Sequence, residues 1–229
     1  MNDILGRALL DHYHNLSKSK LWINNKYGPP EEMPIATYFR EENDMPDIEY
    51  MAMEQCRGKV LDIGAGAGSH VLLLQEQGLD ITAIDISLLC VQLMKERGVK
   101  KAVEADIFNY NAEKFDTLLF MMNGIGLAGT LQQLKQLLTH LKTLLTKGGQ
   151  ILFDSSDIAY LYEGKLPMQG YYGEIQYQYS YKKLKTEWFN WLYIDEHTLQ
   201  QIAAETGFSM EVLLEDEFGQ YLVRLTLMT

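Results

Sequence analysis

The feature that most constrains the fold is a regular alternation of short apolar strands and amphipathic helices over residues 59–154. The strand predicted at residues 115–122 is almost continuously apolar, which is typical of a central strand in a parallel sheet. The other strands are predicted at residues 60–63, 80–85, 101–105 and 150–153. The helices are predicted at residues 69–77, 88–97 and 131–145, the first capped by Ser69 and the last ended by Gly148 and Gly149. This alternation favours a parallel sheet with helices on both faces and right-handed crossovers.

The segment before this alternation, residues 1–57, is predicted to form a helical N-terminal cap. Apolar residues recur at helical spacing over residues 4–14, and a second helix is expected over residues 46–56. Between the two helices, the run YGPP at residues 27–30 interrupts regular structure. The remaining residues, 58–229, are expected to form the main domain.

The last third of the chain changes to a period of two. Residues 171–185 alternate polar and apolar side chains, which predicts an antiparallel strand or hairpin in an insertion near residues 165–192. Asp195 is expected to cap a helix, and strands are predicted at residues 208–214 and 221–227. We therefore expect an α/β fold: a doubly wound, mostly parallel seven-stranded sheet whose last strand is antiparallel.

Charge and cysteine content narrow the classes of partner and compartment. The formal net charge of -11 disfavours nucleic acid and anionic membranes as partners, because these select basic surfaces. The basic run at residues 182–185 is interpreted as a solvated face, with a local basic patch as the alternative. No stretch approaches the roughly 20 apolar residues of a membrane-spanning helix. With only Cys56 and Cys90, and an N-terminus unlike a signal peptide, the cytoplasm is expected.

Three consecutive predicted strands end in residues with unusual chemistry. The first is followed by the run GAGAG at residues 64–68, where glycines allow positive φ and a close approach of backbone to a ligand. Asp85 ends the second strand, where a carboxylate can accept both hydroxyls of a ribose. Asp106 follows the third strand, where it can accept from the exocyclic amine of adenine. Each aspartate alone could be a turn residue, but together they indicate a ligand site at the carboxyl edge of the sheet.

The runs VLDIGAGAG, ITAIDIS, EADIF and LLTKGGQILFDSS resemble those of the class I S-adenosylmethionine-dependent methyltransferases. The match covers residues 59–154, in order and at the family's spacing. The resemblance implies a Rossmann-like methyltransferase fold, S-adenosylmethionine as cofactor and S-adenosylhomocysteine as product.

The resemblance also implies roles for individual residues. Asp62 and the backbone of Gly64, Ala65 and Gly66 would face the methionine part of the cofactor. Asp85 would hold the ribose. The adenine would be contacted by Ile86, Asp106 and Ile107, and the residues that face the transferred methyl would begin at Asn123.

Two alternatives to a methyltransferase stay open. A nicotinamide dinucleotide site would have a glycine at the sixth position of its G-x-G-x-x-G fingerprint, where this chain has Ser69. The position of Asp106 and the antiparallel ending favour the methyltransferase over that oxidoreductase. A non-catalytic S-adenosylmethionine-binding sensor or partner module is the second alternative, because binding the cofactor does not by itself prove turnover.

The acceptor is predicted to be a small molecule. Asn123 is assigned a catalytic role, but Gly124 stands where nucleic-acid and protein-amide methyltransferases have the first proline of their Asn-Pro-Pro-aromatic motif. The acceptor pocket is expected to use the N-terminal segment and the late insertion, both rich in aromatic residues. These residues are Trp22, Tyr27, Tyr38, Phe39, Tyr160, Tyr162, Tyr171, Tyr172, Trp188 and Trp191.

Neither a general base nor a metal site is assigned from the sequence. The five histidines are scattered and are interpreted as surface or helix-face residues. No metal is expected, although Asp154 and Asp157 near the fifth strand are a minor alternative as ligands of a divalent ion.

Overall fold

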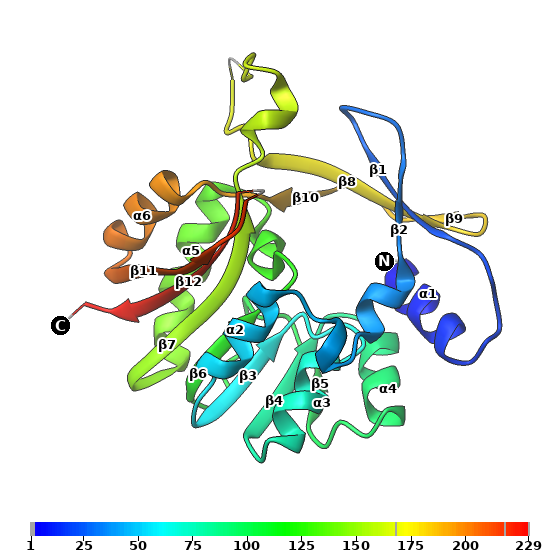
Figure 1. Cartoon of the computed structure of the whole chain (residues 1–229), viewed down its shortest axis with the longest axis horizontal. Helices are drawn as coiled ribbons and strands as arrows, with labels where there is room; N and C mark the ends of the chain where they lie inside the picture. The colour runs from blue at the N-terminus through cyan, green and yellow to red at the C-terminus, as the bar shows by residue number, and fades with distance from the viewer. Residues whose placement is uncertain (1–2, 168, 218, 229) are drawn as a thin grey trace. The chain divides into compact units, whose positions relative to one another are not determined.

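A computed structural model of the chain describes residues 3–167, 169–217 and 219–228 (Figure 1). Its larger sheet has seven strands in the order β11-β12-β7-β6-β3-β4-β5. Neighbouring strands β4 and β5 are parallel, as are β6 and β7, whereas β12 runs antiparallel to both β7 and β11. This confirms the predicted doubly wound, mostly parallel sheet with an antiparallel last strand.

The chain forms two compact units, each assembled from three separate stretches. Unit 1 contains Met1–Met45, Asp62–Asn109 and Gln176–Phe189, and unit 2 contains Pro46–Leu61, Tyr110–Ile175 and Asn190–Thr229. The predicted boundary between residues 1–57 and 58–229 stays a prediction. Among the described residues, no helix is both long and apolar enough to cross a bilayer.

In unit 1, a hydrogen bond between two helix-capping residues joins the N-terminal helix to a later helix. Its helices are α1 (Ile4–Tyr13), α3 (Ser69–Glu76) and α4 (Leu88–Glu96), and its larger-sheet strands are β4 (Asp80–Asp85), β5 (Ala102–Glu104) and the end of β3 (Lys59–Ile63). The Asp3 carboxylate accepts from the backbone N–H of Gly6 at 3.0 Å, which caps α1. The same carboxylate accepts from the Ser87 hydroxyl at 2.6 Å, and Ser87 caps α4. The hydrogen bond between Ser87 and Asp3 therefore holds the predicted N-terminal helix α1 against α4, the helix that follows Asp85.

Unit 1 also contains strands of a second sheet, and those in the N-terminal segment were not predicted from the sequence. β1 (Leu21–Asn25) pairs antiparallel with β2 (Glu31–Met33) and with β8 (Glu174–Tyr181), which turns into β9 (Leu184–Lys185) (Figure 1). The hairpin predicted over residues 171–185 is confirmed by β8 and β9. The N-terminal segment, predicted to be helical, contributes two strands as well as helices.

Unit 2 surrounds the long strand β7 (Leu145–Ser156), which lies between β6 (Phe115–Phe120) and β12 (Gln220–Leu227). Its other elements are β10 (Phe189–Leu192), β11 (Phe208–Glu215), α2 (Asp47–Gln55), α5 (Leu131–Leu144), α6 (Glu196–Glu205) and the 3-10 helix η3 (Gly124–Ala128). Helix α5 buries one leucine stripe, as its spacing predicts. Asp195 caps α6 by accepting from the Thr198 N–H at 2.9 Å, which confirms that prediction.

Two predicted element ends are wrong. Helix α5 ends at Leu144 and β7 begins at the next residue, so Gly148 lies inside a strand and does not end the helix. Helix α3 is capped by Gly68, whose φ of 80° is left-handed, and not by Ser69. The Ser69 hydroxyl is engaged elsewhere, because it donates to the backbone oxygen of Tyr38 at 2.8 Å.

Candidate functional site

The glycine-rich loop in unit 1 connects buried strand β3 to helix α3 in a left-handed conformation. Gly64, Gly66 and Gly68 have φ of 73°, 56° and 80°, values at which a side chain would strain the backbone. The N–H groups of Gly64 and Ala65 donate to the Ile84 oxygen at 2.9 and 3.2 Å, so the loop is held against the end of β4. A Cβ built on Gly64 would meet no atom within 4 Å. Open space therefore lies beside the loop at this position.

Asp85 lies directly under this loop. Its two carboxylate oxygens accept from the N–H groups of Gly66 and Ser87, at 2.9 and 2.8 Å. The Asp85 side chain is only 9% exposed, and this burial raises its pKa. The hydrogen bonds from the Ser87 and Gly66 N–H groups oppose that rise. Each oxygen keeps a second lone pair, so the carboxylate can still accept from a ligand hydroxyl.

Asp62 is the most unusual group in unit 1. Its side chain is 2% exposed, and among the described residues its Oδ2 atom has no hydrogen-bond partner. Burial raises the pKa of Asp62 to about 6, an effect that His70 opposes and Asp85 reinforces. A buried oxygen without a partner costs stability, so this atom is suited to accept from a ligand that supplies the donor.

The predicted adenine contacts differ in exposure. Ile86 is 71% exposed, which leaves its apolar side chain available to a ligand, whereas the Ile107 side chain is buried. The Asp106 carboxylate is exposed and accepts from the Phe108 N–H and the Asn109 side-chain amide, both at 3.0 Å. It therefore stabilises its own turn, and it retains lone pairs that face solvent.

Tyr38 is a unit 1 residue whose position at the glycine loop the sequence did not reveal. It lies in the 3-10 helix η1 (Ile35–Phe39), and its ring is 3.3 Å from where a Cβ on Gly66 would stand. Burial raises the pKa of the Tyr38 phenol well above its ordinary value. From the sequence alone, Tyr38 is only one of the aromatic residues expected around the acceptor, because no local pattern relates it to a loop about thirty residues away.

Arg97 contacts both η1 and the glycine-rich loop. Its guanidinium donates to the Ala67 oxygen at 2.6 Å and to the Ser69 hydroxyl at 3.2 Å. It also lies over the ring of Phe39, 5.0 Å from the centroid, a cation–π geometry. The loop conformation therefore depends on side chains from η1 and from the end of α4.

Asn123, in unit 2, is enclosed by hydrogen bonds within the protein. Its backbone is left-handed, with φ of 54°, and its N–H donates to both oxygens of Asp154, at 3.0 and 2.9 Å. Its side-chain amide donates to the Leu192 oxygen at 3.2 Å and accepts from the Ser155 hydroxyl at 3.1 Å. These bonds fix the turn after β6 and enclose the Asn123 side chain within the protein.

Asp154 is the buried anchor of this turn. Besides Asn123, it accepts from the side-chain amide of Gln220 at 2.8 Å. Burial raises the pKa of Asp154 to about 6, and the negative charge of Glu49 adds to the rise. Among the described residues, no group of three or more His, Cys, Asp or Glu side chains could hold a metal ion.

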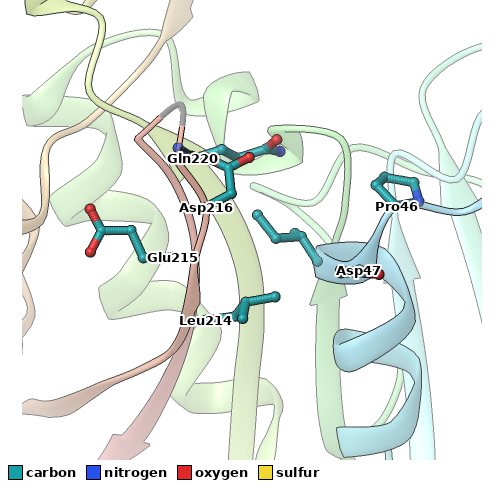
Figure 2. A pocket seen from close by; sticks show the side chains of 7 residues that line it. Pro46, Asp47, Leu214, Glu215, Asp216 and Gln220 are labelled. Carbon is teal, nitrogen blue, oxygen red and sulfur yellow. Dashed lines mark hydrogen bonds between the residues drawn. The ribbon is translucent and has the colours of Figure 1, made fainter.

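A cavity of about 290 Å³ opens in unit 2 beside Gln220. Helix α2 and the residue before it contribute one wall, and the end of β11 with the start of β12 contributes the other (Figure 2). The lining residues are Pro46, Asp47, Ile48, Leu214, Glu215, Asp216 and Gln220. None of the aromatic residues expected around the acceptor lines this cavity.

Comparisons with known proteins agree with this fold. A methyltransferase-domain family model matches residues 37–213. A solved structure of a SAM-dependent methyltransferase from Bacteroides fragilis, in complex with S-adenosyl-L-homocysteine, is 39% identical. It superposes with a TM-score of 0.92, over 99% of this chain and 95% of that one.

More distant similarities have a narrower meaning. An S-adenosylmethionine-dependent methyltransferase from Clostridium acetobutylicum is 14% identical, with a TM-score of 0.61 over 82% of this chain and 94% of that one, which shows the fold alone. The UPF0146 protein PH0209 from Pyrococcus horikoshii is 39% identical over 62 residues, 27% of this chain. The match spans only 47% of that protein's length.

The family match extends over most of the chain and includes the glycine loop, Asp85 and Asp106. This confirms the family that the sequence motifs predict and decides against the nicotinamide-dependent alternative. The chain belongs to the methyltransferase-domain family, with the fold of the class I S-adenosylmethionine-dependent enzymes.

Proposed function

We propose that the protein is an S-adenosylmethionine-dependent methyltransferase that acts on a small-molecule acceptor. The observation that carries this proposal is the buried Oδ2 atom of Asp62, which has no hydrogen-bond partner among the described residues. Asp62 lies two residues before Gly64, at which the glycine loop begins. An ammonium group, such as that of the methionine part of the cofactor, would supply the missing donor and the opposite charge. The open space at Gly64 gives that group room.

The remaining cofactor contacts are proposed from the same unit. The carboxylate of Asp85 would accept from the ribose hydroxyls, and the exposed Ile86 side chain would cover the adenine. Asp106 and the Ile107 backbone would contact the adenine edge, and the backbone of Gly64, Ala65 and Gly66 would border the methionine part. These residues fit the cofactor, because they combine buried acceptors with an exposed apolar side chain.

The reaction requires a general base only if the acceptor starts protonated, as an ammonium, a phenol or an acidic carbon would. The cofactor supplies a methyl group on a sulfonium, which is already strongly electrophilic. The protein's residues bind and orient the acceptor, and such alignment can supply a large part of the rate acceleration. Asn123 is proposed to act through its fixed turn, which shapes the surface that the acceptor meets.

The acceptor class and compartment are also proposals. The net charge of -11 supports a small molecule over nucleic acid. The sequence has only two cysteines, Cys56 and Cys90, which supports a reducing compartment such as the cytoplasm.

Calorimetry with S-adenosylmethionine and S-adenosylhomocysteine tests the cofactor proposal. We expect micromolar binding of both by the wild-type protein and at least tenfold weaker binding by Asp62→Asn, because the amide removes the negative charge. Glu76→Gln, an exposed change of the same kind at the end of α3, is the matched control and should bind as the wild type does. A folded wild-type protein that binds neither compound would refute the proposal.

Turnover distinguishes the enzyme from a non-catalytic binding module. The protein is incubated with S-adenosylmethionine and a library of small acceptors, and formation of S-adenosylhomocysteine is measured. Acceptor-dependent product supports the enzyme. Tight cofactor binding without product from any acceptor class would favour the module.

A further inference from the structure

The Asp3 carboxylate in unit 1 lies between the first turns of two helices. One oxygen accepts from the Gly6 N–H of α1 at 3.0 Å. The other accepts from the Ser87 hydroxyl and the Leu89 N–H at the start of α4, at 2.6 and 3.2 Å. Helix N-termini carry partial positive charge, so a negative charge shared between two of them offsets their mutual repulsion. Asp3 therefore does more than cap its own helix.

Gly6 allows α1 to approach α4 closely. A Cβ atom built on Gly6 would overlap the Ser87 Oγ atom and would stand 2.8 Å from the Leu89 Cβ atom, so a side chain here would push the two helices apart. Glycine inside a helix is about 1 kcal/mol less favourable than alanine. Gly6 is not among the residues with positive φ, so its backbone conformation does not require glycine. The close contact with Ser87 is therefore the physical reason for glycine at this position.

Ser87 connects Asp3 to Asp85, the proposed ribose acceptor. The Ser87 N–H donates to Asp85 Oδ1 at 2.8 Å, while the Ser87 hydroxyl donates to Asp3. The same hydroxyl accepts from the Cys90 N–H at 2.9 Å, so both the backbone and the side chain of Ser87 are fixed. Burial is the main cause of the raised pKa of Asp85, and the nearby charge of Asp3 adds to the rise. The two carboxylates are thus linked through one residue.

The orientation of the Asp85 carboxylate depends on this link. One oxygen accepts from Ser87 and the other from the Gly66 N–H at 2.9 Å, so the two donors together fix the plane of the group. The plane sets the directions in which the remaining lone pairs can accept from a ligand. A displaced Ser87 would therefore turn these lone pairs away from the position that suits a pair of ribose hydroxyls.

We propose that Asp3 is a positioning residue of the cofactor site, which acts through Ser87 to hold the Asp85 carboxylate in the orientation that accepts the ribose hydroxyls. Gly6 belongs to the same arrangement, because it admits Ser87 to the first turn of α1. The inference rests on the proposed cofactor-binding role of Asp85. By thermodynamic linkage, bound cofactor should in turn hold α1 more firmly against α4.

A double-mutant cycle tests the proposal. S-adenosylhomocysteine is titrated by calorimetry into the full chain as wild type, Asp3→Asn, Asp85→Ala and the double variant. Asparagine can still cap α1, but its single oxygen cannot serve both Gly6 and Ser87. We expect Asp3→Asn to weaken binding about fivefold and Asp85→Ala about tenfold or more. In the Asp85→Ala background, Asp3→Asn should weaken binding by less than about twofold, because residues that act through one another are not additive.

Two matched controls accompany the cycle. Asp80 begins β4, the strand that Asp85 ends, and its exposed carboxylate pairs with Lys101, so Asp80→Asn should bind as the wild type does. Gly6→Ala should weaken binding about threefold, because the added Cβ displaces Ser87. Gly28→Ala should leave binding unchanged, since a Cβ there would make only ordinary van der Waals contacts.

Hydrogen exchange of the wild type gives a second readout that does not depend on the folding of any variant. Saturating S-adenosylhomocysteine should slow exchange of the Gly6 and Leu89 amides, which both donate to Asp3. Unchanged exchange of these amides would overturn the proposal. So would wild-type affinity in Asp3→Asn, or a loss as large in the Asp85→Ala background as in the wild type. In each of these cases, binding by the wild type leaves the methyltransferase proposal intact. A folded wild-type protein that does not bind S-adenosylhomocysteine would overturn both proposals.

Discussion

Asp62 and Asp154 are both buried carboxyl groups whose pKa is raised to about 6, but their surroundings differ. Asp154 accepts from the Asn123 N–H and the Gln220 amide, so its burial is compensated by donors of the protein itself. The Oδ2 atom of Asp62 has no such donor among the described residues. Loss of the Asp154 acceptor atoms should therefore destabilise the fold, whereas replacing the Asp62 carboxylate by an amide should stabilise it.

Asp62→Asn is expected to stabilise the protein without ligand. The raised pKa means that burial of the ionised carboxylate opposes folding, by up to about 3 kcal/mol for a shift of about two units. An amide of the same shape removes that cost, so at pH 8 the free energy of unfolding should rise by about 1–2 kcal/mol. Urea denaturation measures it. An unchanged or lower free energy would show that the burial cost of Asp62 is met elsewhere.

The difference in the free energy of unfolding between Asp62→Asn and the wild type should depend on pH. Between pH of about 4 and 6, folded Asp62 holds a proton that the unfolded chain releases, so this group's contribution to stability falls as pH rises. The advantage of Asp62→Asn over the wild type should be near zero below pH 4, grow through this range and level off above it. A constant difference across the range would contradict the assigned cause.

Asp154→Ala should have the opposite effect. It leaves the Asn123 N–H and the Gln220 amide without their acceptor in a buried position, and each lost partner costs about 1–3 kcal/mol. The left-handed turn at Met122 and Asn123 loses its anchor as well. We expect a loss of about 3 kcal/mol in the free energy of unfolding by denaturation. Glu217→Ala, an exposed change near the same strand ends, serves as the control and should cost under about 0.5 kcal/mol.

At the scale of elements, the sequence predicts best where a pattern is local. The parallel strands are short and apolar between clear turns, and the capping residues Ser87 and Asp195 stand next to the helices they cap. Strands β1 and β2 could not be predicted in this way. β1 pairs with β8, and Leu21 lies opposite Tyr181, so its stabilising partners are far away in sequence.

The residues of the candidate site were likewise predictable only where they follow a local pattern along the chain. The glycine loop, Asp85 and Asp106 follow a spacing along the chain, and the sequence identifies them as ligand-binding candidates. The position of Tyr38 against Gly66 arises from the packing of η1 in three dimensions. The bonds that enclose the Asn123 side chain come from Leu192 and Ser155, and no sequence pattern indicates them.

The packing of η1 on the glycine loop predicts the effect of changing Tyr38. Tyr38→Ala removes the ring next to Gly66 and should cost about 3 kcal/mol, with weaker cofactor binding because the loop loses its support. Tyr38→Phe keeps the ring and should retain cofactor affinity within about twofold. Calorimetry and thermal unfolding of both variants measure this. Equal affinities in the alanine and phenylalanine variants would mean that the ring does not support the loop.

The whole chain passes repeatedly between the two compact units. Each unit takes three stretches of sequence, and no single cut separates one unit from the other. The seven-stranded sheet likewise draws on both halves of the sequence. Folding of one unit therefore depends on segments that are distant in sequence, which favours a single cooperative unfolding transition.

A fragment of residues 58–229 should consequently fail to fold alone. It lacks β1, whose five residues pair with β8, and it lacks Gln55, whose backbone oxygen accepts from Gln150 and whose side chain contacts Arg224. Exposed β8 would present an unpaired edge, so we expect aggregation or broad NMR signals, and recovery when residues 1–57 are supplied as a separate peptide. The full chain measured in parallel is the control. Cooperative unfolding of the fragment alone would show that residues 58–229 are an autonomous domain, with the N-terminal segment only an accessory to it.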